Sequence, residues 1–117
     1  MSDAIVVAAG EGEHFDRGNR VVTIVADLPQ LSVLEIEFDA SFEVPPHSHD
    51  DYTDAFLVLA GEVEFTLASG IVTAGPGTLV AAPPGALHGF RTHGPGRARV
   101  LNLHAPDAGF AESVRRG

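Results

Sequence analysis

The 117-residue sequence contains no cysteine and no lysine. Without cysteine the chain can form no disulfide, no thiolate-bound metal cluster and no thiolate nucleophile. Without lysine it has no Schiff-base residue and no phosphate-loop lysine. The seven cations, all arginines, are outnumbered by 16 acidic residues, which gives a net charge of −9. Such a chain repels phosphate backbones and anionic lipids, so we expect no nucleic-acid partner and no membrane partner.

Targeting signals and long apolar runs are also missing. The N-terminus carries no cationic segment, and the apolar stretch at residues 4–9 is too short for a signal core or a membrane span. We therefore expect a soluble, cytoplasmic protein. Hydrophobic residues make up 44% of the chain, enough for a packed core. The length fits a single domain over residues 1–117.

Short apolar runs between turns predict an all-β fold. Thirteen glycines and eight prolines interrupt the chain. Apolar and polar side chains alternate in several runs, with the period of half-buried strands, and such runs recur as in an antiparallel sandwich or barrel. Residues 45 and 46 are prolines, so a strand there is restricted to its start or to a sheet edge. The predicted strands cover residues 20–26, 32–38, 54–60, 62–67, 71–74, 78–82, 87–91 and 98–104, and the only predicted helix covers residues 108–116.

Two patterns that suggest other chemistry do not hold. The G-x-G of residues 10–12 follows an apolar run, but a dinucleotide fingerprint needs a third glycine where this chain has Phe15, and then a long helix. Glu35 and Glu37 share one face of a predicted strand. We interpret them as the solvated face of a half-buried strand rather than as an acid–base pair.

Six histidines are the unusual feature of the composition. Residues i and i+2 of a strand face the same way, so His47 and His49 can both point inward and converge on one cation. Asp54 opens an apolar strand after a four-residue polar break, which we interpret as a hairpin loop. His88 begins a later strand. Three imidazoles and a carboxylate suit Fe, Mn, Ni, Zn or Cu rather than Ca.

The other histidines are assigned structural positions. His14 and His93 lie in polar turns and are expected at the surface. His104 ends an apolar strand and could line a cavity. We favour the plainer interpretation of a satisfied residue at the end of a strand.

Two motifs at matching spacing resemble those of the cupins. The first is a glycine, five residues, H-x-H, three or four residues, a glutamate, six residues and a glycine. The second is a glycine, five residues, P-x-G, two residues, a histidine, three residues and an asparagine. The resemblance covers about residues 20–112. The matching positions are Ser41, His47-Ser48-His49, Asp54 and Gly61 in the first motif, and Gly77, Pro83-Pro84-Gly85, His88 and Thr92 in the second.

The resemblance implies a double-stranded β-barrel of the jelly-roll type, with its core at about residues 20–105. It also implies one divalent transition metal ion, held by His47, His49 and His88 with Asp54 as the fourth ligand. Aspartate is shorter than the glutamate of the motif by about 1.5 Å. Either the strand moves inward, or Asp54 binds through water, or the site is a three-histidine face.

The resemblance implies a small-molecule ligand or substrate. Related barrels act as oxygenases, isomerases, epimerases, decarboxylases or cyclases on small organic compounds, so we expect a metal-dependent enzyme. The alternative is a non-catalytic cupin module that binds or senses a small molecule.

The apolar run at residues 5–9 predicts an assembly contact, because it is too hydrophobic for a free tail. It could pair with an edge of its own barrel or cross to the sheet of a partner. We favour the exchanged strand, and therefore a homodimer.

Overall fold

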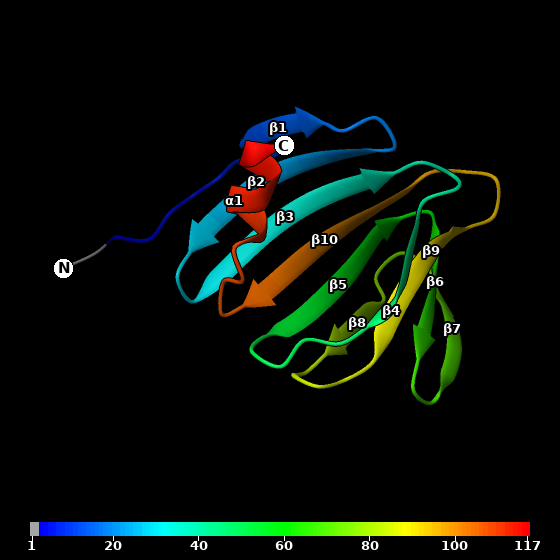
Figure 1. Ribbon diagram of the computed structural model, residues 1–117. Coiled ribbons are helices and arrows are strands. Elements are labelled where there is room, and N and C mark those ends of the chain that lie inside the picture. The colour runs from blue at the N-terminus through cyan, green and yellow to red at the C-terminus, as the bar shows by residue number, and fades with distance from the viewer. Residues whose placement is uncertain (1–2) are drawn as a thin grey trace.

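The computed structural model describes residues 3–117 and contains ten strands and one short helix in that range (Figure 1). The elements are β1 (Glu13–Asp16), β2 (Arg20–Leu28), β3 (Leu31–Phe38), β4 (Glu43–His47), β5 (Thr53–Ala60), β6 (Glu62–Leu67), β7 (Gly70–Ala74), β8 (Leu79–Ala82), β9 (His88–His93), β10 (Ala98–Ala105) and α1 (Phe110–Arg116).

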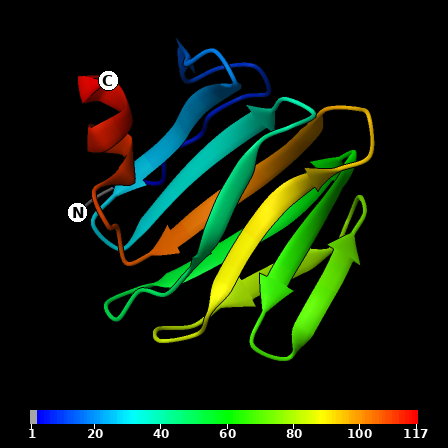
Figure 2. The same ribbon diagram turned by 45° about the vertical axis from the view of Figure 1, so that its right-hand side comes forward.

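The strands form two sheets that face each other, as Figure 2 shows. The larger sheet has the order β1-β2-β3-β10-β5-β8, and the smaller has the order β4-β9-β6-β7. Every paired strand is antiparallel to its neighbours. This architecture confirms the predicted all-β class and the jelly-roll arrangement.

Alternation along the strands builds the core between the sheets. On β3, Leu34 and Ile36 are buried, whereas Glu35 and Glu37 lie on the outer face. Glu37 accepts a hydrogen bond of 2.7 Å there from the exposed Arg97. The two glutamates therefore belong to a solvated strand face, as their spacing predicts.

All eight predicted strands are present, but β1 and β4 were not predicted. The sequence of β1 has one apolar residue among four, so it shows no alternating pattern. The strand forms because its backbone pairs with β2. In β4 the pairing with β9 shifts register between Val44 and His47, across the two prolines. Because β4 is the edge strand of its sheet, prolines without an amide hydrogen are tolerated.

The loop of residues 48–52 is not a hairpin, which corrects the sequence-based interpretation. β4 pairs with β9 in the smaller sheet, whereas β5 pairs with β10 and β8 in the larger one. The loop therefore crosses from one sheet to the other. As a result, His47 and Asp54 face each other from different sheets.

Helix α1 is shorter than the predicted range of 108–116 and begins after Gly109. Its buried residues, Ala111 and Val114, pack into the core, and the helix lies beside β2 and β3 (Figure 2). Arg115 fixes the helix end, with its Nη1 atom 2.7 Å from Oδ2 of Asp27. No helix in residues 3–117 is long and apolar enough to cross a membrane.

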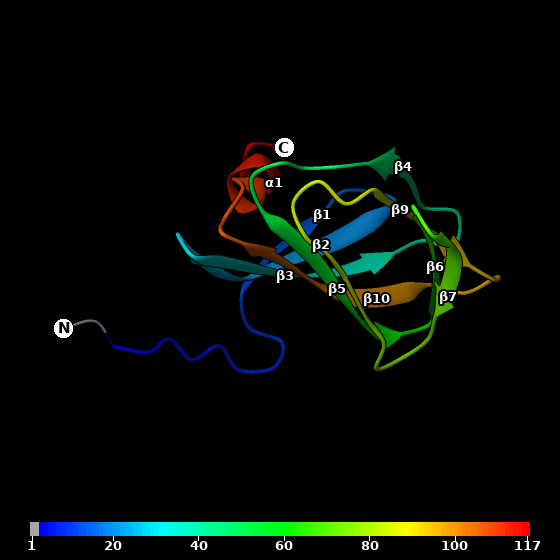
Figure 3. The ribbon, with the colours of Figure 1, turned by 90° about the horizontal axis from the view of Figure 1, so that it is seen from below.

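The apolar segment of residues 5–9 forms no strand with its own barrel. It runs out from the sheets toward the N-terminus (Figure 3). Val6 is 90% exposed and Ile5 is 54% exposed. Of the two predicted possibilities, pairing with an edge of its own barrel is therefore excluded in this structure.

Candidate metal centre and its cavity

The four predicted metal ligands come together between the sheets. His47 ends β4, His49 lies in the loop that follows, and His88 begins β9 directly opposite His47. Asp54 reaches the same place from β5 in the larger sheet. One ligand atom from each of the four residues lies within 4.8 Å of the others. This cluster is able to hold a metal ion.

The position of His49 has a different cause from the predicted one. β4 ends at His47, so strand alternation does not orient His49. Aromatic contacts hold its ring instead. Tyr52 stacks on the His49 ring with centroids 4.4 Å apart, and His47 meets it edge-on at 4.6 Å. The loop therefore presents the second imidazole of the H-x-H motif.

Hydrogen bonds to the backbone orient two of the rings. Nδ1 of His47 lies 2.9 Å from the Pro45 carbonyl oxygen, and Nδ1 of His88 lies 3.0 Å from that of Ala86. A carbonyl oxygen only accepts, so Nδ1 must donate in both rings. In the neutral ring the Nε2 lone pair is then free for a cation, as in many metal-binding histidines.

Asp54 has protein partners at both carboxylate oxygens. Its Oδ2 atom lies 3.1 Å from Nε2 of His88 and 3.5 Å from Nε2 of His49. Its Oδ1 atom accepts a hydrogen bond of 2.7 Å from Asn102 and lies 3.1 Å from Nε2 of His104. The oxygen Oδ2 thus faces the cluster, and Oδ1 is held from the other side.

These contacts set the protonation states. Burial raises the pKa of Asp54, but His104 and the hydrogen bond from Asn102 outweigh it and bring the pKa below its ordinary value. Burial and the neighbouring His47 lower the pKa of His49. An ionised carboxylate and a neutral imidazole are the forms that ligate a metal ion.

Asn102 and His104 complete the site and were not predicted as part of it. Both are buried on the inward face of β10, which also carries Ala98 and Val100. His104 lines the cavity and contacts Asp54, so the interpretation as a plain strand-end residue is wrong. The signal was present in the sequence, because alternation from Val100 places polar residues 102 and 104 on the buried face.

The two remaining departures from the motifs have simple structural solutions. Ser41 lies in an exposed turn, and no non-glycine residue among residues 3–117 has a positive φ, so glycine is not required there. The Thr92 hydroxyl donates to the Asp39 carbonyl oxygen at 2.6 Å and lies 3.2 Å from that of Phe42. These contacts fix the segment that precedes β4 against β9.

His14 and His93 are exposed, as predicted, although each lies in a strand rather than a turn. The His14 ring contacts the Thr23 hydroxyl at 2.8 Å. The His93 ring lies 3.5 Å from a carboxylate oxygen of Glu64 on the outside of the smaller sheet. Neither belongs to the cluster.

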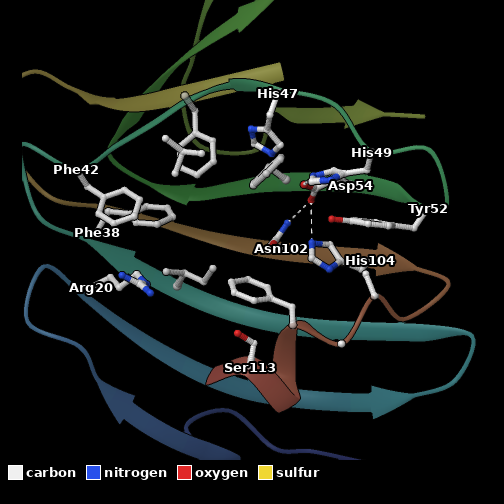
Figure 4. A pocket seen from close by; sticks show the side chains of 17 residues that line it. Arg20, Phe38, Phe42, His47, His49, Tyr52, Asp54, Asn102, His104 and Ser113 are labelled. Atoms are coloured by element: carbon white, nitrogen blue, oxygen red, sulfur yellow. Dashed lines mark hydrogen bonds and ion pairs between the residues drawn. The ribbon is translucent and has the colours of Figure 1, made fainter. Parts of the chain in front are cut away.

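A cavity of about 470 Å³ adjoins the cluster, within the range of small-molecule sites (Figure 4). Three cluster residues, His47, His49 and Asp54, form one part of its wall, with Tyr52 and His104 beside them. Phe38 and Phe42 stack at 4.5 Å and form another part. Helix α1 contributes Phe110, which stacks on the His104 ring at 5.4 Å. The site is therefore an apolar hollow with a polar cluster at one end.

Comparison with known families identifies the motif-bearing part of the chain. The family model described as "Cupin domain" matches residues 34–104, more than half of the sequence, and that range includes all four cluster residues. None of the curated proteins matches the sequence.

Several solved structures are similar over most of the chain. KdgF from Halomonas sp. is 24% identical with a TM-score of 0.82, covering 93% of this chain and 99% of that one. An RmlC-like cupin from Shewanella frigidimarina is 21% identical with a TM-score of 0.77, covering 92% and 96%. A variant of Streptomyces PAC13 with uridine is 20% identical with a TM-score of 0.67, covering 89% and 83%. At these identities the likeness shows a shared fold.

Proposed function

The chain belongs to the cupin-domain family, and from that membership and the His–Asp cluster we propose that it is a metal-dependent enzyme acting on a small organic substrate. One divalent transition metal ion, from among Fe, Mn, Ni, Zn and Cu, would be held by His47, His49, Asp54 and His88. The substrate would occupy the adjoining cavity.

The observation that carries this proposal is the contact between His88 and Asp54. The His88 ring donates through Nδ1 to the Ala86 carbonyl, so in its neutral form Nε2 has a lone pair and no hydrogen. That atom nevertheless faces the Asp54 oxygen at 3.1 Å. Two acceptors at this distance repel each other unless a second ring proton or a cation lies between them. His47 and His49 each offer a further ligand atom within 4.8 Å of the other cluster ligand atoms, which favours a cation.

The neighbouring residues fit supporting roles around such a centre. Asn102 and His104 hold Oδ1 of Asp54 and so direct Oδ2 to the histidines. Burial and Asp54 raise the pKa of Tyr52, which therefore keeps its proton at neutral pH. Its hydroxyl points toward the cluster (Figure 4) and is placed to donate a hydrogen bond to a bound substrate. When bound, the metal ion would polarise a substrate oxygen as a Lewis acid.

Metal content of histidine variants tests the proposal. We expect His47→Ala, His49→Ala and His88→Ala each to lose most of the bound metal, because each removes one of few strong ligands. His14→Ala and His93→Ala are the controls, since both side chains lie outside the cluster. Elemental analysis of untagged protein gives the measurement. Equal loss of metal in the controls and the cluster variants would contradict the assignment.

One observation favours a second candidate, a binding or sensing cupin that works without metal. Both oxygens of Asp54 already have protein partners, so the cluster can exist as a closed network. The same elemental analysis separates the two functions. Stoichiometric metal supports the enzyme, whereas metal-free protein that binds an organic ligand supports the sensor.

Assembly and location complete the proposal. Ile5 and Val6 are exposed, and their segment pairs with no strand within residues 3–117; both observations support a homodimer in which this segment contacts a partner. A cytoplasmic location stays a prediction from the sequence.

A further inference from the structure

Arg20 points into the barrel at the start of β2. Its side chain lies on the same face as Val22 and Ile24, both buried in the core, and it lines the cavity (Figure 4). The inward face of a barrel strand is an expensive place for a guanidinium, because partial burial removes part of its hydration. Packing in the hydrophobic core therefore does not explain why this position carries a charged side chain.

Within residues 3–117, Arg20 also has no carboxylate partner, although the protein is strongly acidic. Five other arginines lie within 4.0 Å of an acidic side chain, namely Arg91, Arg97, Arg99, Arg115 and Arg116. Arg17 donates to the Val114 carbonyl and does not line the cavity. Among the side-chain hydrogen bonds, ion pairs and cation–π pairs of residues 3–117, Arg20 has two: the Asn19 amide oxygen at 3.3 Å and the Phe42 ring, 5.7 Å from its centroid. Its charge is thus left available to the cavity.

The location of Arg20 relative to the cluster defines a two-ended site. Figure 4 shows the guanidinium in one part of the cavity and the His–Asp cluster in another, with Phe38 and Phe42 near the guanidinium. A ligand that fills this space meets a cation at one end, an aromatic wall beside it, and the cluster at the other end.

We infer that the ligand of this cavity is a small organic carboxylate whose carboxylate group is held by Arg20 while its opposite end reaches the His–Asp cluster. The inference deepens the proposed function by naming the substrate class, and it rests on that function for the role of the cluster. The planar guanidinium can donate two parallel hydrogen bonds to a carboxylate. Apart from histidines, Arg20 is the one basic residue lining the cavity in the described chain, and its single charge matches a carboxylate better than a phosphate dianion.

Matched charged and neutral ligands test the inference. The probes are 3-phenylpropionate and hexanoate, each paired with its amide, together with inorganic phosphate. Binding is measured by calorimetry and by chemical-shift changes, both in protein loaded with one equivalent of Zn²⁺ and in EDTA-treated protein. The EDTA arm is needed because a carboxylate can also bind a metal ion directly.

We expect Arg20→Gln to weaken binding of at least one carboxylate about tenfold or more in both metal states, the usual effect of losing a charge-assisted pair. The amides should bind the parent and this variant equally. Arg20→Lys, which keeps the charge and loses the planar fork, should fall between them. Arg97→Gln is the matched control, because it removes the same charge from an exposed residue paired with Glu37 and Asp39. Thermal unfolding of all variants shows whether each is folded.

Equal carboxylate binding by the parent and Arg20→Gln would overturn the inference. So would amides that bind as tightly as the acids, phosphate that binds more tightly than either, or no binding of any carboxylate at 10 mM. Metal content of the same samples keeps the two proposals apart. Arg20-dependent binding by a protein that takes up no metal rejects the enzyme and supports the anion site. Metal uptake without carboxylate binding rejects the anion site alone.

Discussion

Asp54 shows how one side chain can organise a site from the middle of a network. It replaces a longer glutamate of the cupin motif, yet its Oδ2 atom still approaches His88 to 3.1 Å. Position on β5 therefore compensates for the shorter side chain. The other oxygen is held by Asn102 and His104, so the carboxylate has one orientation. Asp54 thus lies within the cluster, and its role as a direct ligand stays a prediction.

Substitution of Asp54 tests whether it is a ligand. Asp54→Asn keeps the shape and removes the charge, so we expect metal affinity to fall at least about tenfold. Asp54→Ala should lose as much and should also unfold more easily, by about 1–3 kcal/mol, because Asn102 and His104 lose a buried partner. Competition titration with a metal chelator and urea unfolding give the two measurements.

Asp51→Asn is the control for charge, since Asp51 is exposed in the neighbouring loop. If both Asp54 variants bind metal like the parent, the centre is a three-histidine face. Asp54 would then be a structural residue.

Protonation of the histidines predicts how metal binding depends on pH. A protonated imidazole has no lone pair, so protons compete with the metal ion. Occupancy at a fixed, near-equimolar metal concentration should fall as pH drops below about 6.5, the ordinary pKa of histidine. Because the pKa of His49 is lowered, this ring loses its metal-binding form only at a lower pH. The pKa of Asp54 is also lowered, so its carboxylate stays ionised while the histidines become protonated. Unchanged occupancy at pH 4 would argue against histidine ligation.

At the scale of the elements, the turn between β5 and β6 decides how the site strand meets β10. Gly61 has a φ of 75°, in the left-handed region that favours glycine. A Cβ atom there would meet the Arg97 carbonyl oxygen and approach the Ala98 Cα atom to 2.9 Å. Position 61 therefore requires glycine for two reasons: the backbone conformation, and the close approach of the chain at the start of β10.

Two glycine variants separate these requirements. Gly61→Ala and Gly94→Ala share the cost of a left-handed residue, roughly 1–2 kcal/mol. Gly94 also has a positive φ of 83°, but a Cβ atom there meets nothing within 4 Å. We expect Gly61→Ala to lower the free energy of unfolding by at least about 2 kcal/mol more than Gly94→Ala, as overpacking adds to the strain. Urea unfolding measures both, and equal losses would show that the close approach has no cost.

At the scale of the whole molecule, apolar surface remains that the described chain does not cover. Ile5 and Val6 are exposed at the N-terminus. Ile71 on β7 and Leu79 on β8 are also exposed, and both strands lie at sheet edges. Uncovered edges of this kind invite pairing with another chain.

Removal of the N-terminal segment tests the proposed homodimer. We expect light scattering of the full chain to give about twice the 12.2 kDa of one chain. Deletion of residues 1–10 should shift the protein toward a monomer or an aggregate. Val6→Asp, which keeps the length of the segment, should weaken the dimer in the same direction. A monomeric full-length protein at high concentration would contradict the proposal.

The fold class and the metal motif could be predicted from the sequence because both depend on local order. A two-residue period assigns each side chain to a face, and that placed Asp54 with Phe56 and His88 with Phe90 on buried faces. Motif spacing along the chain then named the four cluster residues. The helix was predicted for a similar reason, because Phe110 and Val114 are four residues apart and share one helix face.

The partners of those residues were decided only by the tertiary structure. Local period does not encode which strands pair, because pairing depends on apolar faces that are buried together across long stretches of chain. The loop after β4 thus crosses between sheets, and β10 brings Asn102 and His104 to Asp54 from 48 and 50 positions away along the sequence. No role for Arg20 was predicted from the sequence, and the packing of the two sheets makes it a cavity residue. The sequence therefore determined which side chains could bind a metal ion. The hydrogen-bond network that orients Asp54 forms only when the two sheets pack together, because its members come from strands that are distant in the sequence.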